Sequence, residues 1–472
     1  MDPLEICYQS AGQLSKLIKL GQISPVEIIE AHLDRIELTE PVLNSFITLT
    51  AEQAINAAHK AESEITSGNY KGPLHGIPVG LKDLFNTGGI KTTSGSRIFD
   101  NFIPDRDCTV AARFNNAGAI LLGKLNMHQF AYGPTGENPD YGHMHNPWNP
   151  DHYAGGSSGG SGSATAAGQC TVTMGSDTGG SVRIPASLCG IVGLKPTYGL
   201  LSRHGLTPLA WSMDHPGPMV RTVEDAAIVL NAISGADHND KTTYDHPESN
   251  YTTALIENIN GLKIGVVKEF FDDLIHPEVD HTVREALKKL EELGAQLIEI
   301  SFPMYSESQA ISSTILMSEA AAYHRELVLN QGDQLYEPVR LRLQSGLLIS
   351  AADYIRAQQA RTMFNQEASK LLQDVDLLVG PTEPVPAPPL LSPDVTIQGK
   401  TIGITPALTQ YTRPYNITGF PAISIPCGFS EDRLPIGLQL AGKPFDEITL
   451  LRAAYTYEQS TTWHKARPNL IT

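Results

Sequence analysis

Residues 153–196 read YAGGSSGGSGSATAAGQCTVTMGSDTGGSVRIPASLCGIVGLKP, and this stretch decides the fold of the chain. Two glycine–serine turns, residues 155–160 and 175–181, flank a run of small residues. A glycine in a regular element costs roughly 0.5–1 kcal/mol of backbone entropy, and it adds no core volume. The stretch therefore predicts that backbone N–H groups approach a reacting ligand closely.

Two familiar functions of a glycine–serine turn do not fit the residues around positions 155–160. A phosphate-binding loop needs G-x-x-x-x-G-K-[ST], and residues 155–160 have that spacing, but Ser161 stands in place of the lysine. A nucleophile elbow on Ser157 would have to follow a buried strand. Residues 146–152 precede it instead, and their two prolines remove hydrogen-bond donors from a strand.

A flexible linker is a third interpretation of residues 155–160, because glycine and serine dominate linkers. It conflicts with the residues that come next: residues 164–167 predict a helix of small residues, and residues 171–174 predict an apolar strand. Acyl transfer by a serine is the interpretation that we favour.

Ser181 is the candidate nucleophile of such a reaction. Consecutive backbone N–H groups beside its hydroxyl could form an oxyanion hole, and the predicted donors are Thr178, Gly179, Gly180 and Ser181. A serine hydroxyl needs a base at neutral pH. Lys82 follows the apolar segment 77–81, which would bury its amine and favour the neutral form.

With Lys82 added, the two turns make the chain resemble the amidase signature family of serine hydrolases. The resemblance implies that Lys82 is the base, Ser157 the serine that relays the proton, and Ser181 the nucleophile. The intervals between them are 157 − 82 = 75 and 181 − 157 = 24 residues. The resemblance extends to four further segments, residues 122–127, 193–199, 416–422 and 434–439.

The family resemblance also implies a fold and an activity. We expect an α/β fold, a single large domain with a mixed, twisted β-sheet surrounded by helices. Residues 1–70 should form a helical region packed on a catalytic domain of residues 71–472. The implied reaction is hydrolysis of the C–N bond of a small amide, aryl acylamide, ureide or carbamate through an acyl-enzyme on Ser181, with no cofactor.

Two classes of enzyme in this family remain open. One is a stand-alone amidase, and the other is the glutaminase A subunit of a tRNA-dependent amidotransferase, which works inside a heteromeric complex. That subunit carries an acidic residue ahead of its T-x-P-x-N segment, whereas residues 407–416, ALTQYTRPYN, contain no carboxylate. We therefore expect a stand-alone amidase that acts on a small molecule as a monomer or homodimer.

The wall of the substrate pocket is predicted after the family's L-N-M segment. Because aromatic and apolar residues are frequent there, we expect the pocket to accept a neutral group. The predicted substrate-binding residues are Asn126, Met127, Tyr132, Gly133, Pro134 and Thr135.

A metal site is the main chemical alternative, because imidazole and carboxylate groups are zinc ligands. The candidates lie in a segment without strand character, and no carboxylate stands at helical spacing from the H-x-H pair. We therefore predict no metal. The residues considered are His143, His145, His152, Asp214 and His215.

Composition limits the partners. The chain of 472 residues has a net charge of −17, which disfavours direct binding of nucleic acid. Its five cysteines have no C-x-x-C spacing and predict no disulfide framework. The N-terminus has no signal pattern, and no apolar run reaches the ~20 residues of a membrane span, so we expect a cytoplasmic protein.

Helices and strands are predicted to alternate along the chain. The expected helices begin after Ser24 and at residues 51, 109, 279 and 350. The expected strands are residues 77–81, 119–122, 171–174, 262–267, 296–300 and 376–379. Residues 381–399 are rich in proline and predict an extended surface loop near the mouth of the site.

Overall fold

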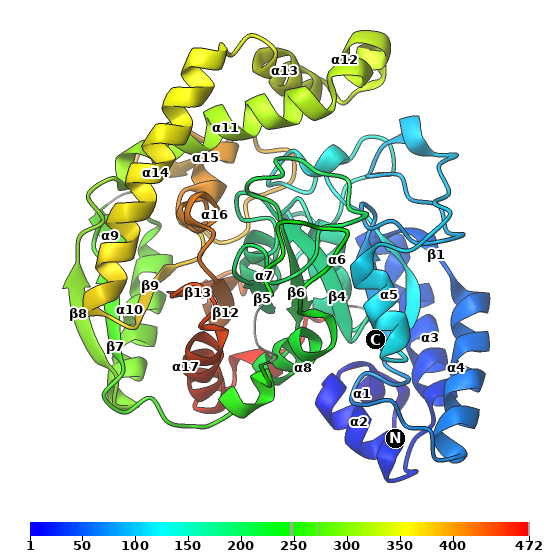
Figure 1. Ribbon diagram of the computed structural model, residues 1–472. Helices are drawn as coiled ribbons and strands as arrows, with labels where there is room; N and C mark the ends of the chain where they lie inside the picture. The colour runs from blue at the N-terminus through cyan, green and yellow to red at the C-terminus, as the bar shows by residue number, and fades with distance from the viewer. Residues whose placement is uncertain (246–248, 273, 471–472) are drawn as a thin grey trace.

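A large mixed β-sheet forms the centre of the molecule in the computed structural model, which describes residues 1–245, 249–272 and 274–470 (Figure 1). Its strands are β1 (Phe46–Leu49), β2 (Pro78–Lys82), β3 (Ile120–Leu125), β4 (Val172–Asp177), β5 (Val192–Lys195), β6 (His215–Val220), β7 (Lys263–Val267), β8 (Gln296–Ile300), β9 (Leu377–Pro381), β12 (Ala422–Phe429) and β13 (Pro435–Gly442). Their order in the sheet is β1-β3-β2-β4-β6-β5-β12-β13-β9-β7-β8.

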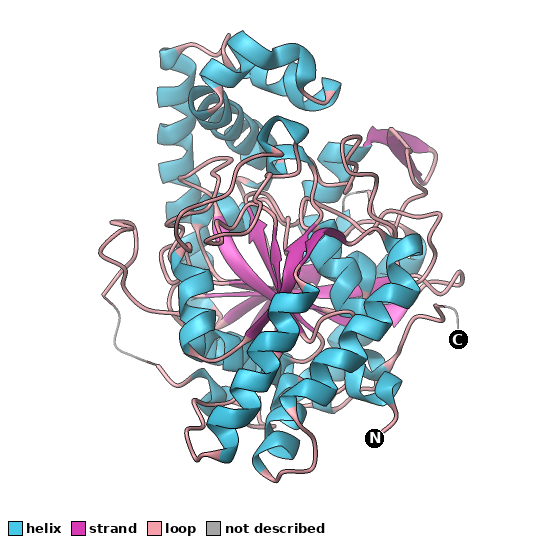
Figure 2. Cartoon of the chain, turned by 90° about the vertical axis from the view of Figure 1, so that its right-hand side faces the viewer, coloured by secondary structure: helices cyan, strands magenta, loops and turns pink. Residues whose placement is uncertain are grey.

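Helices surround this sheet, as Figure 2 shows. They are α1 (Pro3–Cys7), α2 (Ala11–Lys19), α3 (Pro25–Leu43), α4 (Ala51–Thr66), α5 (Thr109–Asn116), α6 (Gly159–Ala166), α7 (Arg183–Cys189), α8 (Val223–Ile233), α9 (Glu269–Asp272), α10 (Pro277–Glu292), α11 (Ser308–Tyr323), α12 (Arg325–Gln331), α13 (Glu337–Gly346), α14 (Ala351–Asp374), α15 (Ile404–Thr409), α16 (Pro414–Thr418) and α17 (Glu447–Gln459). The expected α/β fold is confirmed.

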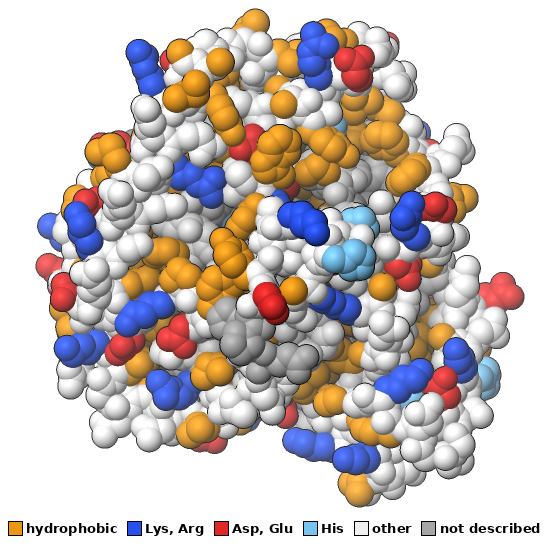
Figure 3. Space-filling view, in the orientation of Figure 1, with side chains coloured by type: hydrophobic (Ala, Val, Ile, Leu, Met, Phe, Trp, Pro, Cys, Tyr) orange, Lys and Arg blue, Asp and Glu red, His pale blue; other side chains and the backbone are white. Residues whose placement is uncertain are grey.

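Helices α11, α12 and α13 lie above the sheet in Figure 1, and α14 runs from them down one side of the molecule, where Phe364, Ala368 and Leu372 pack with Leu378 of β9. Figure 3 shows hydrophobic side chains gathered over the upper part of this face of the molecule, and several large hydrophobic side chains of helices α11 to α14 are exposed. These exposed side chains are Tyr323, Leu329, Leu341, Ile355 and Met363.

The central strands are hydrophobic because both faces of the sheet are covered. Every residue of β2, β4, β5 and β13 is buried. Strand β2 runs parallel to both β3 and β4, with Leu81 opposite Met174 in the β2–β4 register. The carboxyl ends of β2 and β4 therefore meet at one edge of the sheet, and this brings Lys82 beside the second glycine–serine turn.

Local sequence signals explain several element boundaries. Helix α3 begins with a complete capping box, in which the Ser24 hydroxyl accepts from the Glu27 N–H and the Glu27 carboxylate accepts from the Ser24 N–H. The predicted helices at residues 51, 109, 279 and 350 are confirmed as α4, α5, α10 and α14, and the six predicted strands are confirmed within a few residues.

Helices α1 to α4 occupy most of residues 1–70, and the short strand β1 among them pairs with β3 at the edge of the sheet. One feature departs from the sequence-based expectation. Residues 381–399 are only partly a surface loop: Val385 and Ala387 pack in a hydrophobic cluster with Ile184 and Leu408, and a hairpin of β10 (Asp394–Ile397) and β11 (Lys400–Gly403) follows. None of the described helices is long and apolar enough to cross a membrane.

Candidate active site

Lys82 ends strand β2, and its amine is surrounded by hydroxyl groups. The side chain has no exposed surface. Its Nζ donates to Ser157 Oγ at 2.6 Å, Ser158 Oγ at 2.9 Å and Ser176 Oγ at 2.9 Å. No carboxylate of the described residues forms an ion pair with it. The pairing of Lys82 with Ser157 was predicted, while the other two hydroxyls were not.

The environment of Lys82 prepares it to act as a base. Burial lowers the pKa of this amine to about 7, although the negative charges of Asp177 and Asp214 oppose the shift. About half of the lysine is then neutral at pH 7, which is what general-base catalysis at neutral pH needs. The neighbouring Asp83 belongs to another contact, because it pairs with Lys124 at 3.1 Å.

Ser157 lies in a tightly packed turn. The Gly156–Ser157 peptide bond is cis. A side chain at Gly156 would collide with the backbone of residues 133–136, since a Cβ atom there would lie 2.6 Å from the Gly136 nitrogen. Ser157 does not cap helix α6, whose N-cap is Ser158. Its side chain is therefore free to serve Lys82.

Ser181 lies in the loop between β4 and α7. It is 8% exposed, and its hydroxyl has no hydrogen-bond partner among the residues that the structure describes. The Ser176 hydroxyl, at the end of the same strand, contacts Lys82. The loop that carries Ser181 therefore begins at the edge of the sheet where Lys82 and Ser157 meet, and no hydrogen bond joins Ser181 to either of them within the described chain.

Asp177 shapes the loop that carries Ser181. Its carboxylate accepts from the Gly180 N–H at 2.8 Å and the Val182 N–H at 3.2 Å. Gly180 thus directs its N–H at Asp177 in this structure. Of the four predicted oxyanion donors, the N–H groups of Thr178, Gly179 and Ser181 have no partner within the described part of the chain.

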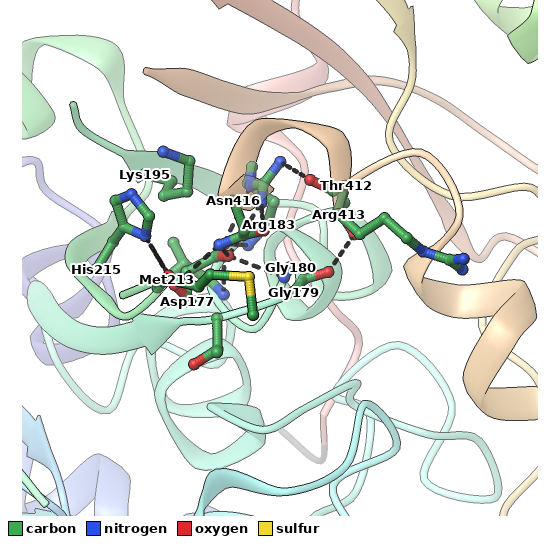
Figure 4. A network of polar contacts seen from close by, with 12 residues as sticks. Asp177, Gly179, Gly180, Arg183, Lys195, Met213, His215, Thr412, Arg413 and Asn416 are labelled. Atoms are coloured by element: carbon green, nitrogen blue, oxygen red, sulfur yellow. Dashed lines mark hydrogen bonds and ion pairs between the residues drawn. The ribbon is translucent and has the colours of Figure 1, made fainter. Parts of the chain in front are cut away.

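A buried ion pair anchors Asp177 in turn. Arg183 donates Nη2 to Asp177 Oδ1 at 2.9 Å and Nε to Oδ2 at 3.0 Å (Figure 4). Asn416 donates to the same carboxylate at 2.8 Å. Burial favours the neutral acid, but Arg183 outweighs it and holds the pKa of Asp177 well below its usual range. The sequence does not reveal Asn416 as a partner, because it lies 239 residues away.

The predicted substrate wall divides into two parts. Asn126 has no exposed surface, and its amide donates to the carbonyls of Asn44 and Gly142 at 3.1 Å each. These contacts favour a structural role. Gly133 and Pro134 lie nearer the catalytic turn, since a Cβ atom on Gly156 would be 2.9 Å from the Gly133 carbonyl oxygen and 3.1 Å from the Pro134 carbonyl carbon. The remaining members, Met127, Tyr132 and Thr135, are buried.

A cavity of about 210 Å³ lies beside the Lys82 cluster. Ser176 forms part of its wall, and so does Asp214, which accepts from the Thr178 hydroxyl at 2.6 Å. This cavity was not predicted from the sequence, because most of its lining residues lie in segments 203–215 and 239–240, which carry no motif. The other main lining residues are Ala131, Arg203, Leu206, Thr207, Trp211 and His215.

Two of the histidines considered as metal ligands contact backbone carbonyl groups. His145 Nδ1 lies 2.6 Å from the Pro150 carbonyl oxygen, and His215 Nδ1 lies 2.6 Å from that of Met213. Among the described residues, no group of three or more His, Cys, Asp or Glu side chains is placed to hold a metal ion.

Comparison with known proteins gives this geometry a family. The Amidase family model matches residues 27–451. The chain belongs to the amidase signature family. The A subunit of the glutamyl-tRNA(Gln) amidotransferase from Trichlorobacter lovleyi is 41% identical over 99% of this chain and 100% of its own length.

Solved structures support the family and its fold. A chain from a vestigial protein complex, reported in connection with the origins of an s-triazine catabolic enzyme, matches with a TM-score of 0.93 at 34% identity. It covers 98% of this amidase and 100% of its own chain. The A subunit of the glutamyl-tRNA(Gln) amidotransferase from Thermotoga maritima matches with a TM-score of 0.83 at 33% identity and covers 99% of each chain. This protein is therefore an amidohydrolase of the amidase signature type.

Proposed function

We propose that the protein cleaves amide C–N bonds through an acyl-enzyme on Ser181. The observation that carries the proposal is the 2.6 Å contact between Lys82 Nζ and Ser157 Oγ, with the lysine fully buried. The Ser181 hydroxyl attacks the carbonyl carbon while its proton passes through Ser157 to neutral Lys82. The proton returns to the leaving nitrogen, and water then releases the acyl group by the same route.

The oxyanion formed in each attack needs donors close to Ser181. The N–H groups of Thr178, Gly179 and Ser181 are the members of the predicted set that have no partner in the described chain. Removal of one such donor typically costs about 2.7–4 kcal/mol of transition-state stabilisation. Asp177 and Arg183 hold the loop in this form, so their role is to position these donors.

The first candidate substrate is glutamine, and the comparisons favour it. The curated relatives are amidotransferase A subunits that are 40–42% identical over at least 95% of this chain. In this proposal the protein is the alternative that the sequence left open, a glutaminase A subunit that works with partner subunits. This candidate has more support from full-length relatives than the stand-alone amidase.

The second candidate is a stand-alone amidase for a small amide, aryl acylamide, ureide or carbamate, in the cytoplasm. A specific observation favours it: Thr409 and its neighbours provide no carboxylate where the amidotransferase subunit carries an acidic residue.

One set of assays separates these candidates. The purified chain would be given glutamine, an aryl amide and a carbamate, alone and with the partner amidotransferase subunits and glutamylated tRNA. Glutaminase activity that requires the partners supports the first candidate, and hydrolysis of a simple amide by the chain alone supports the second.

The catalytic part of the proposal has its own test, in which a fluorophosphonate labels the nucleophile. Ser181→Ala should abolish labelling, whereas Ser157→Ala should weaken it. If labelling persists in Ser181→Ala and vanishes in Ser157→Ala, Ser157 is the nucleophile and the assignment is wrong.

A further inference from the structure

A polar cavity of about 450 Å³ lies where the two ends of the chain meet. Its wall comes from three segments: residues 8–13 at the start of α2, residues 221–224 at the start of α8, and residues 455–467 at and beyond the end of α17. Arg467 pairs with Glu5 through hydrogen bonds of 2.7 and 3.0 Å, and Figures 1 and 2 both draw the N- and C-termini on the same side of the molecule. The cavity therefore has no part in the proton relay.

Arg221 is a buried cation in this wall. It is 8% exposed, and its donors reach only backbone carbonyls: Nη1 donates to Thr165 and Cys170 at 3.2 Å each, and Nη2 donates to Gln9 at 2.7 Å. No carboxylate of the described residues forms an ion pair with it. Carbonyl groups satisfy the hydrogen bonds of a guanidinium but carry no net charge, and buried charges are usually paired. An anion in the cavity would supply the missing countercharge.

Two more guanidinium groups lie around the ring of Tyr8, which forms part of the wall. The Cζ atoms of Arg467, Arg221 and Arg35 lie 4.5, 5.5 and 6.0 Å from the centre of this ring. Arg35 is 7% exposed and donates Nε to the Ala167 carbonyl at 2.9 Å, and it too has no carboxylate partner within the described chain. Positive charge is therefore concentrated around Tyr8.

Few ionised carboxylates oppose these cations. Both oxygens of Glu5 are engaged by Arg467. The charge of Asp225 acts on Arg221, and Asp225 Oδ1 already accepts from the Gly12 N–H at 3.1 Å. Burial raises the pKa of Asp225 to about 6, so it is only partly protonated at pH 7 and counts as a negative charge.

The remaining side chains of the wall add positive charge and hydrogen-bonding capacity. Glu224 pairs with Lys16 at 3.7 Å, and burial raises the pKa of Glu458 to about 8, so Glu458 is mainly neutral at pH 7. Lys465 has no ion pair in the part of the chain that the structure describes. His464 Nδ1 is buried, and it has no hydrogen-bond partner among the described residues. The wall thus has an unused cation and an unused ring nitrogen.

We propose that this cavity binds a phosphate group. Four cations, Arg35, Arg221, Lys465 and Arg467, face two ionised carboxylates there, which leaves about two positive charges in a protein whose net charge is −17. A phosphate monoester carries about 1.5–2 negative charges at pH 7, and its oxygens accept strong hydrogen bonds from guanidinium and ammonium groups. The cavity is larger than one phosphate group, so it also has room for the organic part of an ester. The site is separate from the proposed hydrolytic function.

Lys465 and Arg467 are the residues to change in a test. Arg221 is not suitable, because it holds carbonyls on both sides of the connection between α6 and β4, and its loss would disturb the fold. The test variant is Lys465→Gln combined with Arg467→Gln. The matched control is Lys370→Gln combined with Arg325→Gln, which also removes one lysine and one glutamate-paired arginine, but outside the cavity.

Binding of inorganic phosphate and of glycerol 3-phosphate would be measured by calorimetry on the full chain, with sodium chloride used to keep the ionic strength constant. We expect both to bind and to raise the melting temperature, because a ligand of the folded state stabilises it. The test variant should bind at least about tenfold more weakly, because hydrogen bonds to charged groups contribute strongly. Lys465→Gln alone, which keeps the pair between Arg467 and Glu5, should weaken binding by about three- to tenfold. The control should bind as the wild-type protein does.

The two ligands also distinguish the source of the phosphate. Tighter binding of glycerol 3-phosphate assigns the cavity to a phosphorylated metabolite, and tighter binding of inorganic phosphate assigns it to the free ion. The proposal is wrong if neither ligand binds the wild-type protein at millimolar concentration, or if the test variant binds as tightly as the control. No turnover is needed, so these results are independent of the acyl-enzyme mechanism.

Discussion

Lys82 and Lys124 are two fully buried lysines on neighbouring strands with different surroundings. In the β2–β3 register, Lys82 lies opposite Leu125 and Leu81 opposite Lys124. The Lys82 amine meets three serine hydroxyls. The Lys124 amine meets the Asp83 carboxylate at 3.1 Å and the Thr92 hydroxyl at 2.7 Å. The two strands thus place similar side chains in a neutral and in an ionic environment.

The different surroundings of the two lysines show how one fold makes both a general base and a structural cation. Burial disfavours the charged form of any amine, and an adjacent carboxylate opposes that effect. Lys82 has hydroxyls as its neighbours, and its pKa falls to about 7. Burial also lowers the pKa of Lys124, but the charge of Asp83 and its hydrogen bond act against the shift. Lys82 can therefore accept a proton, while Lys124 holds β2 and β3 together.

The largest expected effect follows from removal of the base. Lys82→Met should lower kcat/KM for any accepted amide by about 10²–10⁴-fold at pH 7, because general-base catalysis typically contributes that much. Part of the activity should return as pH rises, since hydroxide can then take the Ser181 proton. Steady-state kinetics between pH 6 and 10 would measure this. A variant with nearly normal turnover at pH 7 would show that Lys82 is not the base.

A double variant tests whether Lys82 and Ser157 act as one catalytic unit. Groups of one catalytic unit are strongly non-additive. Lys82→Met combined with Ser157→Ala should therefore cost little more than the worse single change. If the two losses simply multiply, the proton does not pass from Ser157 to Lys82.

Removal of the structural cation should act on stability instead. Lys124→Met leaves Asp83 buried without its partner, and breaking such a pair typically costs about 3–5 kcal/mol. Urea unfolding would measure the loss in the free energy of unfolding. The double variant Lys124→Met with Asp83→Asn should recover much of the lost stability, because the unpaired buried carboxylate is then removed as well. A Lys124→Met protein that unfolds at the wild-type urea concentration would contradict the comparison.

The role of Lys82 in this contrast could be predicted from sequence, whereas that of Lys124 could not. The apolar segment before Lys82 and the composition of the two turns are local signals, and the family resemblance adds the roles of Lys82, Ser157 and Ser181 to them. The partners of Lys82 other than Ser157 are not predictable in this way. Ser176 reaches Lys82 because β2 and β4 are adjacent in the sheet, although 94 residues separate them.

Long-range packing also explains what the substrate-wall prediction missed. Asn126 belongs to the family's L-N-M segment, yet its amide binds backbone carbonyls of distant loops. Arg342 carries no motif and reaches Tyr132 only because α13 packs over that segment. A hydrophobic pattern predicts the helix, but the face against which it packs depends on the whole fold.

The pH dependence of catalysis should reflect Lys82 and not Lys124. Lys82 must be neutral to act, and its pKa is about 7. Between about pH 5 and 6.5, kcat/KM should therefore rise nearly tenfold per pH unit, and it should level off above about pH 8. Lys124→Met, assayed where it is folded, should keep this profile. If the ascending limb of the wild-type kcat/KM profile lies near pH 10 instead, Lys82 behaves as an ordinary, solvated lysine.

The smallest effect concerns a single hydroxyl of the Lys82 cluster. Ser176 Oγ accepts from Lys82 Nζ at 2.9 Å and thereby stabilises the protonated amine. One such hydrogen bond contributes about 0.5–1.5 kcal/mol, so Ser176→Ala should lower the pKa of Lys82 by at most about one unit. The ascending limb of the kcat/KM profile should move to lower pH, with the plateau changed only a few-fold. A limb that moves to higher pH would mean that Ser176 donates to the neutral amine, and the proton relay would then include a third serine.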